Sequence, residues 1–230
     1  MNKNEIKEEL FKYEDLGYKD FHSKLKPSDS DIIGVRSKYI RDLAKRLAKD
    51  GWKEYIDSLG FSDTYEEKLI AGMSVFYAKA DVETIVNYSE KIIPFIDGWG
   101  ICDGICSTMK LKGDEKKKYW NYLVEKCIYS KKEFKTRVAL VIMLKYIEEE
   151  YIDEILKIVD RVEYVSYYDQ MAAAWLLQGC MAKFEEKTFE YMKNASVNDW
   201  VFNKAISKMR ESFKVDNEMK ETLKTMIRQS

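Results

Sequence analysis

The chain has 230 residues and a formal net charge of −1, and its composition narrows the fold class more than its length does. It contains only 10 glycines and 2 prolines, which is too few turn-forming residues for a many-stranded barrel or sandwich and excludes an all-β fold. Hydrophobic residues make up 46% and charged residues 34% of the chain, a combination typical of a helical globular protein. The near-neutral charge gives no bulk electrostatic reason for nucleic-acid binding, so any such site must be a local patch.

The sequence shows no membrane-spanning or secretory pattern. No apolar run reaches the roughly 18 residues that a membrane helix needs. The N-terminal stretch MNKNEIKEELFKYED is too charged for a signal peptide. We therefore expect a cytoplasmic protein with no membrane partner.

Cysteine and histidine usage limits the chemistry that the chain can perform. The cysteines Cys102, Cys106, Cys127 and Cys180 form no CxxC pair, and buried thiols are the ordinary expectation for them in a reducing compartment. His22 is the one histidine, which argues against a zinc site and against a nucleophile activated by histidine. We expect no metal and no cofactor, and carboxylates and aromatic rings would have to carry any catalysis.

Apolar residues recur at helical spacing almost throughout, with short breaks at residues 26–30, 60–63, 113–114, 130–132 and 194–198. Three helix starts can be assigned from capping residues. Asp63 or Thr64 would begin a helix that ends near Ala78, Asp81 one that ends near Tyr88, and Asp114 one that ends near Tyr129.

Five segments repeat at a nearly constant interval. They are KLIAGMSVFYA from Lys68, DGICSTMKLKG from Asp103, RVALVIMLKYI from Arg137, QMAAAWLLQGC from Gln170 and KAISKMRESFK from Lys204, and they start 35, 34, 33 and 34 residues apart. Amphipathic partners such as residues 116–129 and 151–161 lie between them. This period predicts an all-α protein, an α-solenoid or superhelix of HEAT-like antiparallel helix pairs that forms one domain over residues 1–230. An irregular helical bundle is the alternative.

In such a solenoid one helix of every pair lines a concave groove, so equivalent positions face the same surface. The segments bring Asp103, Arg137, Gln170 and Lys204 to this surface. Trp99 lies one helical turn before Asp103, and Trp175 lies just over one turn after Gln170, so both rings can reach the same region. A carboxylate beside aromatic rings and an arginine forms a chemically meaningful cluster.

Four motifs carry a resemblance to a known family. They are IIGVRSKYIRDLAKRL from Ile32, DGWGICDGI from Asp97, FKTRVALVIMLKY from Phe134 and QMAAAWLLQGCMAKFEEKTFEYM from Gln170. In their order and separations they resemble the DNA alkylation repair family, the HEAT-like-repeat, AlkD-like 3-methyladenine DNA glycosylases. Trp99 and Asp103 match the family's Trp-x-x-x-Asp motif, Arg137 and Lys145 its basic helix, and Trp175 its second cleft tryptophan.

The resemblance implies a base-excision glycosylase for cationic N3- or N7-alkylated purines in double-stranded DNA. Such a base is already a good leaving group, so the enzyme mainly has to stabilise positive charge that develops on the sugar. Asp103 would supply that charge stabilisation and orient the attacking water. Trp99 and Trp175 would pack against the cationic nucleotide, and Arg137 would clamp a phosphate.

Basic residues near these motifs could form a phosphate footprint despite the neutral total charge. The candidate DNA-binding residues are Arg36, Lys38, Arg41, Lys135, Lys145, Lys204 and Lys208. The alternative is that most of them are ordinary solvated surface residues.

Two departures from the family favour a subgroup that binds DNA weakly and excises little or nothing. Active relatives often carry an arginine three positions after the second tryptophan, where this chain has Gln178. A short helix enters the minor groove in active relatives, but Pro27 and a Ser/Asp cluster predict broken helix in the segment from His22 to Ile33.

Simpler structural roles compete with the functional ones. Asp103 can serve as a helix-start residue, and Arg137 can pair with Glu133 one turn away. His22 fits a loop or a helix end. The run Glu148-Glu149-Glu150 would repel DNA and should lie away from a groove, and the remaining tryptophans, Trp52, Trp120 and Trp200, are expected in the core.

The sequence therefore leaves three function classes open. The leading one is a monofunctional DNA glycosylase that acts as a monomer on alkylated duplex DNA. The second is a catalytically weak or inactive HEAT-like scaffold that binds DNA or a protein partner through the concave groove. The third is a generic protein-binding solenoid, for which an apolar or acidic groove is expected.

Overall fold

The structure is a computed structural model, and it describes residues 1–229. Within that range the regular elements are all helical, and one isolated bridge pairs Glu14 with Val35. The all-α class predicted from composition is thus confirmed. The elements are α1 Lys3–Lys12, α2 Leu16–Lys24, α3 Ser37–Leu47, α4 Trp52–Asp57, α5 Tyr65–Tyr77, α6 Val82–Ile92, η1 Ile93–Phe95, α7 Trp99–Cys106, α8 Gly113–Tyr122, η2 Leu123–Cys127, α9 Glu133–Met143, η3 Leu144–Tyr146, α10 Ile152–Arg161, α11 Tyr167–Lys183, α12 Glu185–Asn194, α13 Asp199–Glu211 and α14 Asn217–Thr225.

Helix starts follow the capping chemistry in two of the three predicted cases. The Thr64 hydroxyl accepts from the Glu67 amide and closes a capping box at α5, and the Asp81 carboxylate accepts from the Thr84 amide at α6. The third prediction was wrong, because α8 begins at Gly113 with Lys112 as its cap and leaves Asp114 inside the first turn. Its regular part ends at Tyr122, where the π-helical turn η2 takes over.

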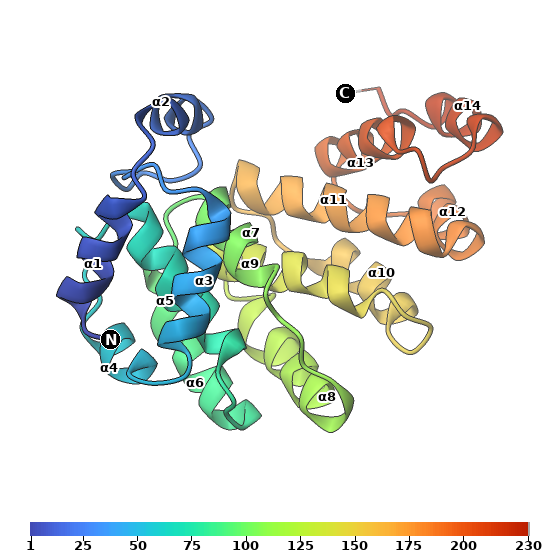
Figure 1. Cartoon of the computed structure of the whole chain (residues 1–230). Helices are drawn as coiled ribbons and strands as arrows, with labels where there is room; N and C mark the ends of the chain where they lie inside the picture. Colours follow the sequence, from blue (N-terminus) through green and yellow to red (C-terminus); the bar gives the residue numbers. More distant parts are fainter. Residues whose placement is uncertain (230) are drawn as a thin grey trace. The chain divides into compact units, whose positions relative to one another are not determined.

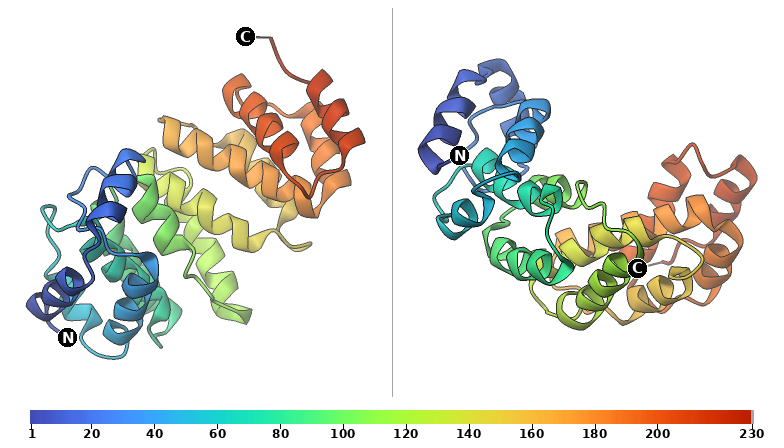
Figure 2. Two further views of the ribbon diagram at one scale, coloured as in Figure 1. Left: turned by 45° about the horizontal axis from the view of Figure 1, so that its top comes forward. Right: turned by 60° about the horizontal axis from the view of Figure 1, so that its bottom comes forward.

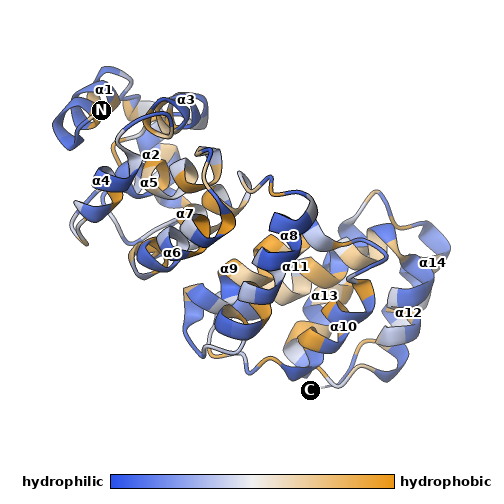
Figure 3. Cartoon of the chain, turned by 90° about the horizontal axis from the view of Figure 1, so that it is seen from below, coloured by the Kyte–Doolittle hydropathy of each residue, from blue (hydrophilic) through white to orange (hydrophobic). Residues whose placement is uncertain are grey.

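The chain divides into two compact units, Met1–Leu123 and a second unit that starts at Val124. In the first unit α5 packs against both α3 and α7, while α6 packs against α5 and α8 (Figure 1). Buried apolar residues on α5 and α7, such as Leu69, Ile70 and Ile105, form its core. Hydrophobic colour is correspondingly concentrated on α5 and α7, whereas α1 is mainly hydrophilic (Figure 3).

In the second unit α11 packs between α9 and α13, and α10, α12 and α14 cover these helices from outside (Figures 1 and 2). The repeated segments that start at Arg137, Gln170 and Lys204 thus fall on neighbouring helices, as the period predicted. Those that start at Lys68 and Asp103 fall on the neighbouring helices α5 and α7 of the first unit.

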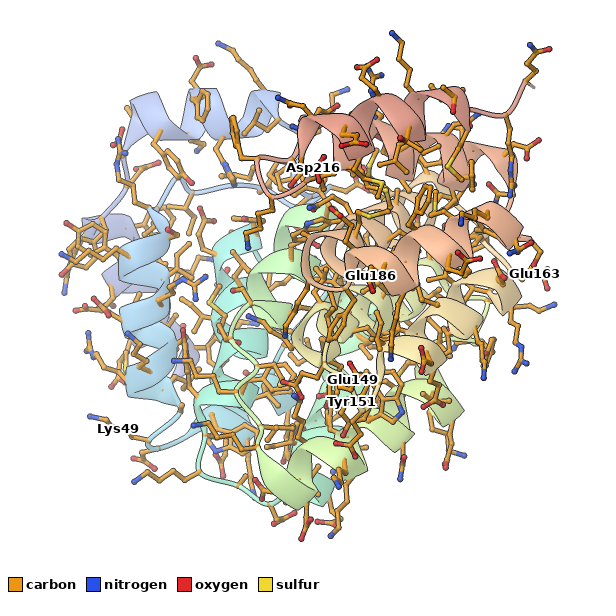
Figure 4. All side chains as sticks on the ribbon, turned by 90° about the vertical axis from the view of Figure 1, so that its right-hand side faces the viewer. Lys49, Glu149, Tyr151, Glu163, Glu186 and Asp216 are labelled. Atoms are coloured by element: carbon orange, nitrogen blue, oxygen red, sulfur yellow. The ribbon has the colours of Figure 1, made fainter. Side chains whose placement is uncertain are left out.

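The acidic run at residues 148–150 is exposed in the turn before α10. Glu149, labelled in Figure 4, accepts a hydrogen bond from Lys187 of α12 at 2.5 Å. The run therefore belongs to the outer helices of the second unit.

Most core predictions are confirmed and one is wrong. All four cysteines are buried, and Trp52 and Trp120 are 8% and 5% exposed. Trp200, expected in the core, is 41% exposed. It lies in the first turn of α13, where its ring packs edge-on against the exposed Tyr167. Two exposed rings that pack on each other remove apolar surface from water without entering the core.

Candidate functional site

Helix α7 presents Trp99 and Asp103 on one face. Its apolar positions Ile101, Cys102 and Ile105 are buried in the first unit. Trp99 and Asp103 are only partly buried, and residues four apart on a helix lie one above the other. The structure therefore brings the predicted tryptophan and carboxylate together at the surface of the first unit.

The start of α7 is held by the loop that follows α2. The Gly100 amide donates to the Pro27 carbonyl at 2.8 Å. A Cβ atom at Gly98 would lie 2.2 Å from that carbonyl oxygen and 2.4 Å from Ser28 Cα, and one at Gly100 would lie 2.6 Å from Pro27 Cβ. Such distances are far inside van der Waals contact, so both glycines are required by the close approach of this loop. The Pro27 segment is thus a support for the Trp-x-x-x-Asp helix.

A buried ion pair fixes the same junction. Asp97, two residues before Trp99, accepts hydrogen bonds from the hydroxyls of Ser28 and Ser30 and from the Lys68 ammonium at 2.8 Å. The side chain of Lys68 is 3% exposed. Burial opposes ionisation of Asp97, but its hydrogen bonds to Lys68, Ser28 and Ser30 outweigh burial and hold the pKa of this carboxyl below its usual value.

Tyr65 lies beside α7, and the ring of His22 packs against Tyr65. The sequence did not predict this pair. Tyr65, the first residue of α5, is 7% exposed, and its hydroxyl lies 3.1 Å from the position that a Gly100 Cβ would occupy. Burial raises the pKa of Tyr65, with smaller contributions from Tyr18, Glu66 and Asp103. The His22 ring lies 5.2 Å from the Tyr65 ring and 5.1 Å from that of Tyr18.

His22 lies in the last turn of α2, as a helix end was one expectation for it. The helix break predicted at Pro27 is present, because α2 ends at Lys24 and Pro27 lies outside any helix. The first three residues of the segment from His22 to Ile33 still belong to α2. Every residue of α2 is at least partly exposed. The helix therefore has no buried apolar face, which is the pattern that identifies most helices in a sequence. Its aspartate cap, Asp15, accepts from the Tyr18 amide and supplied the one local signal.

In the second unit Trp175 and Lys208 line one cavity of about 830 Å³. Trp175 is 38% exposed, and Gln178 on the same wall donates to the Ser212 hydroxyl at 3.3 Å. Phe213, after α13, also lines the cavity and is fully exposed. Phe213 was not among the residues predicted from the sequence. An aromatic residue in a polar stretch between two helices could have indicated it as a surface residue with a binding role.

Arg137 is 4% exposed at the start of α9. Its guanidinium donates to the Tyr168 carbonyl at 2.6 Å and lies 6.0 Å from the Tyr168 ring. This contact ties α9 to the first turn of α11. Phosphate binding by Arg137 stays a prediction, and at least one of its donors is already used within the protein.

The predicted basic residues differ in how far their charges are already paired. Arg36 forms an ion pair with Asp15 at 2.8 Å, and Arg41 donates to the hydroxyls of Tyr77 and Ser107. Lys38 is exposed and has no ion-pair partner among residues 1–229. Lys145 is exposed, whereas Lys135, Lys204 and Lys208 are partly buried.

Among residues 1–229 no group of three or more histidine, cysteine, aspartate or glutamate side chains could hold a metal ion. None of the described helices is long and apolar enough to cross a membrane.

One protein-family model matches most of the chain. The model of the family described as DNA alkylation repair enzyme matches residues 6–209 of the chain. The chain belongs to the DNA alkylation repair enzymes. The matched range includes every predicted site residue, from Arg36 to Lys208. Neither the curated proteins nor the solved structures contain a significant match to the chain.

Membership of the DNA alkylation repair family gives the partly exposed pair on α7 a functional context. The family indicates a role in the repair of alkylated DNA and thus an interaction with DNA. In this family member Trp99 and Asp103 are surface residues on a helix whose start is fixed by a buried ion pair and two close-packed glycines.

Proposed function

We propose that this protein is a DNA glycosylase of base excision repair that hydrolyses the N-glycosidic bond of cationic N3- or N7-alkylated purines in duplex DNA. The observation that carries the proposal is the Trp99–Asp103 pair on α7. The two side chains remain partly exposed on a helix whose apolar side chains are buried, and the start of this helix is anchored through Asp97 and Lys68. Preorganised charge of this kind is what a cationic transition state requires.

Asp103 is the proposed catalytic carboxylate. As the bond between C1′ and the purine nitrogen breaks, the bonding electrons go to the base, which leaves neutral, and positive charge develops on the deoxyribose. The carboxylate stabilises that charge and orients a water molecule whose oxygen bonds to C1′. The proton that this water loses goes to bulk solvent. Because the base is already cationic, the reaction needs no strong general acid and no metal or cofactor.

Trp99 and Trp175 would bind the cationic nucleotide through their ring faces. The attraction between a cation and an aromatic face amounts to about 0.5–2 kcal/mol per ring, depending on how far water is excluded. The faces remain favourable when charge moves from the base to the sugar, so they help binding and catalysis alike.

Duplex DNA would lie in the concave groove that the 34-residue period predicts for a single HEAT-like domain. Lys38 and Lys145 are the predicted phosphate contacts with the most exposed ammonium groups, and Lys208 stands beside Trp175 in the cavity of the second unit. We further propose that the protein acts as a cytoplasmic monomer.

A second candidate is a scaffold of the same family that binds DNA or a protein with little or no excision. Two observations favour it. Gln178 is neutral where active relatives often carry an arginine, and its amide already bonds to Ser212. The guanidinium of Arg137, the other predicted phosphate clamp, is buried and bonded to Tyr168.

Single-turnover base release separates the two candidates. Wild-type protein in excess would be incubated at low salt with duplex DNA that carries 7-methylguanine and 3-methyladenine, so that weak binding is not mistaken for absent chemistry. Release of both cationic bases, without release of uracil from a matched duplex, supports the glycosylase. No release at saturating protein, with binding shown in parallel by anisotropy, supports the scaffold.

A further inference from the structure

Besides the cavity of the second unit, a cavity lies in the first unit, and the proposed function assigns it no role. It has a volume of about 620 Å³ and lies between α1, α2, the loop after α2 and the cap of α5. Its walls carry three lysines, an aromatic ring and several hydroxyl groups. The residues that matter here are Lys7, Lys19, Lys26, Phe11, Ser23 and Ser28.

The lining of this cavity carries a net positive charge. Neither Lys7 nor Lys26 has an ion-pair partner among residues 1–229, and Lys19 lies 3.6 Å from Glu14 in a pair that is partly exposed. Asp31 is the one acidic residue among the lining residues. Two lysines without ion-pair partners on one lining attract an anion, and lysine is a common ligand of phosphate.

Hydrogen bonds hold two of the serines that line the cavity. Ser28 and Ser30 line it while their hydroxyls bond to Asp97, which in turn binds the buried Lys68. Lys26 adopts a left-handed backbone with φ of 48°, which costs a non-glycine residue energy and fixes the direction in which its side chain leaves the loop.

The lining of the cavity is partly apolar. Phe11 of α1 lines the cavity and is 52% exposed. The Ser23 hydroxyl of α2 lies on the same lining and is a donor beside the lysines. An aromatic ring, a hydroxyl and ammonium groups together match a phosphate that carries a sugar or a base rather than a bare halide or a carboxylate.

We propose that this cavity binds a nucleotide phosphate, with Lys7 and Lys26 as its principal charges. The phosphate can come from the backbone of DNA or from a free nucleotide. A backbone source has a structural argument in its favour, since Ser28 and Ser30 on the cavity lining bond to Asp97, two residues before Trp99. The inference does not depend on base excision and would hold for an inactive scaffold.

The test compares two double variants that each remove two positive charges. Lys7→Gln/Lys26→Gln empties the cavity of its unpaired charges, and Lys49→Gln/Lys79→Gln is the matched control. Lys49 and Lys79 are exposed lysines of the same unit without ion-pair partners among the described residues, and Figure 4 labels Lys49 at the surface beyond α3. Circular dichroism and thermal melting establish that both variants fold.

Three probes are used with each protein: undamaged duplex DNA, adenosine monophosphate and inorganic phosphate. For a backbone phosphate we expect duplex affinity to fall about 3- to 10-fold in the cavity variant, with a salt dependence reduced by about one to two counterions relative to the control variant. For a free nucleotide, adenosine monophosphate binding is lost and duplex binding is unchanged. Ser23→Glu, which adds a negative charge to the cavity wall, must act in the same direction.

The proposal is overturned if the cavity variant binds all three probes as the control variant does. Undamaged DNA is used so that the result is independent of catalysis. Base release by the cavity variant at saturating protein is measured separately, and a failure of the proposed glycosylase activity in wild-type protein leaves the outcome of the binding test unaffected.

Discussion

The Lys68 ammonium lies 2.8 Å from the Asp97 carboxylate, and only 3% of the Lys68 side chain is exposed. Lys68 is the first residue of a repeated helical segment on α5. Asp97 lies two residues before Trp99, the first residue of α7. A buried ammonium is stable only when it is paired, since an unpaired charge in a protein interior costs several kcal/mol. The ion pair therefore couples the folding of α5 to the position at which α7 begins.

Asp97→Asn is expected to lower the free energy of unfolding by about 2–3 kcal/mol at pH 7. This lies below the roughly 3–5 kcal/mol of a fully buried pair, because 28% of the Asp97 side chain is exposed. Urea denaturation followed by circular dichroism measures the change. Asp57→Asn is the control, since the Asp57–Lys91 pair is exposed and such pairs contribute little to stability. Equal losses in both variants would contradict the structural role of Asp97.

The stability difference between wild type and Asp97→Asn should depend on pH. The pKa of Asp97 in the folded protein lies below its ordinary value of 3.8, so between the folded and unfolded pKa values the unfolded chain binds more protons. The stabilisation from Asp97 is therefore complete above the ordinary value and is lost as pH falls through the folded pKa. Denaturation at pH 7, 5 and 3 should show a difference that is constant down to pH 5 and smaller at pH 3. A difference of the same size at pH 3 would exclude this origin.

Gly98→Ala is expected to destabilise the protein by roughly 1–3 kcal/mol, the usual cost of overpacking. The new Cβ would lie 2.2 Å from the Pro27 carbonyl oxygen, and backbone atoms cannot rotate away as a side chain can. Gly60→Ala is the matched control, because the nearest atom to its Cβ lies at 3.8 Å. Thermal melting compares the two. If both alanine variants melt at the same temperature, the close approach of the Pro27 loop does not fix the start of α7.

Trp175→Ala should reduce affinity for methylated DNA about 10-fold while it costs about 1 kcal/mol of stability. The ring is 38% exposed and lines a cavity, so its removal opens little new space in the core. Trp120→Ala removes a ring that is 5% exposed and is expected to cost about 3–5 kcal/mol. Fluorescence anisotropy with methylated duplex and urea denaturation give the two quantities. A large stability loss in Trp175→Ala would assign this ring to the core.

Much of the helical organisation could be predicted from the sequence. The segments that start at Lys68, Arg137 and Lys204 fall on α5, α9 and α13 because apolar periodicity is a local signal. Thr64 and Asp81 mark helix starts because their side chains cap amides three residues later. Asp114 failed as a cap because Lys112 takes the cap position two residues earlier and the helix begins at Gly113, which has a left-handed φ of 54°.

The support of the candidate site could not be predicted in the same way. The hydrogen bonds from Ser28 and Ser30 to Asp97 join residues 69 and 67 positions apart. Lysine is almost never fully buried unless it is paired, so the burial of Lys68 has no signature in a local pattern. The sequence could predict that Trp99 and Asp103 share one face of a helix. For the loop that holds this helix, it predicted only a break at Pro27.

The most direct test of the proposed mechanism is single-turnover release of 7-methylguanine by Asp103→Asn beside Asp50→Asn. Asp50 is an exposed carboxylate of the same unit in the turn after α3, so its variant controls for the loss of one negative charge. We predict that Asp103→Asn reduces the excision rate by about 10²- to 10³-fold at saturating protein, while Asp50→Asn matches wild type. Equal excision rates in Asp103→Asn and wild type would contradict the account.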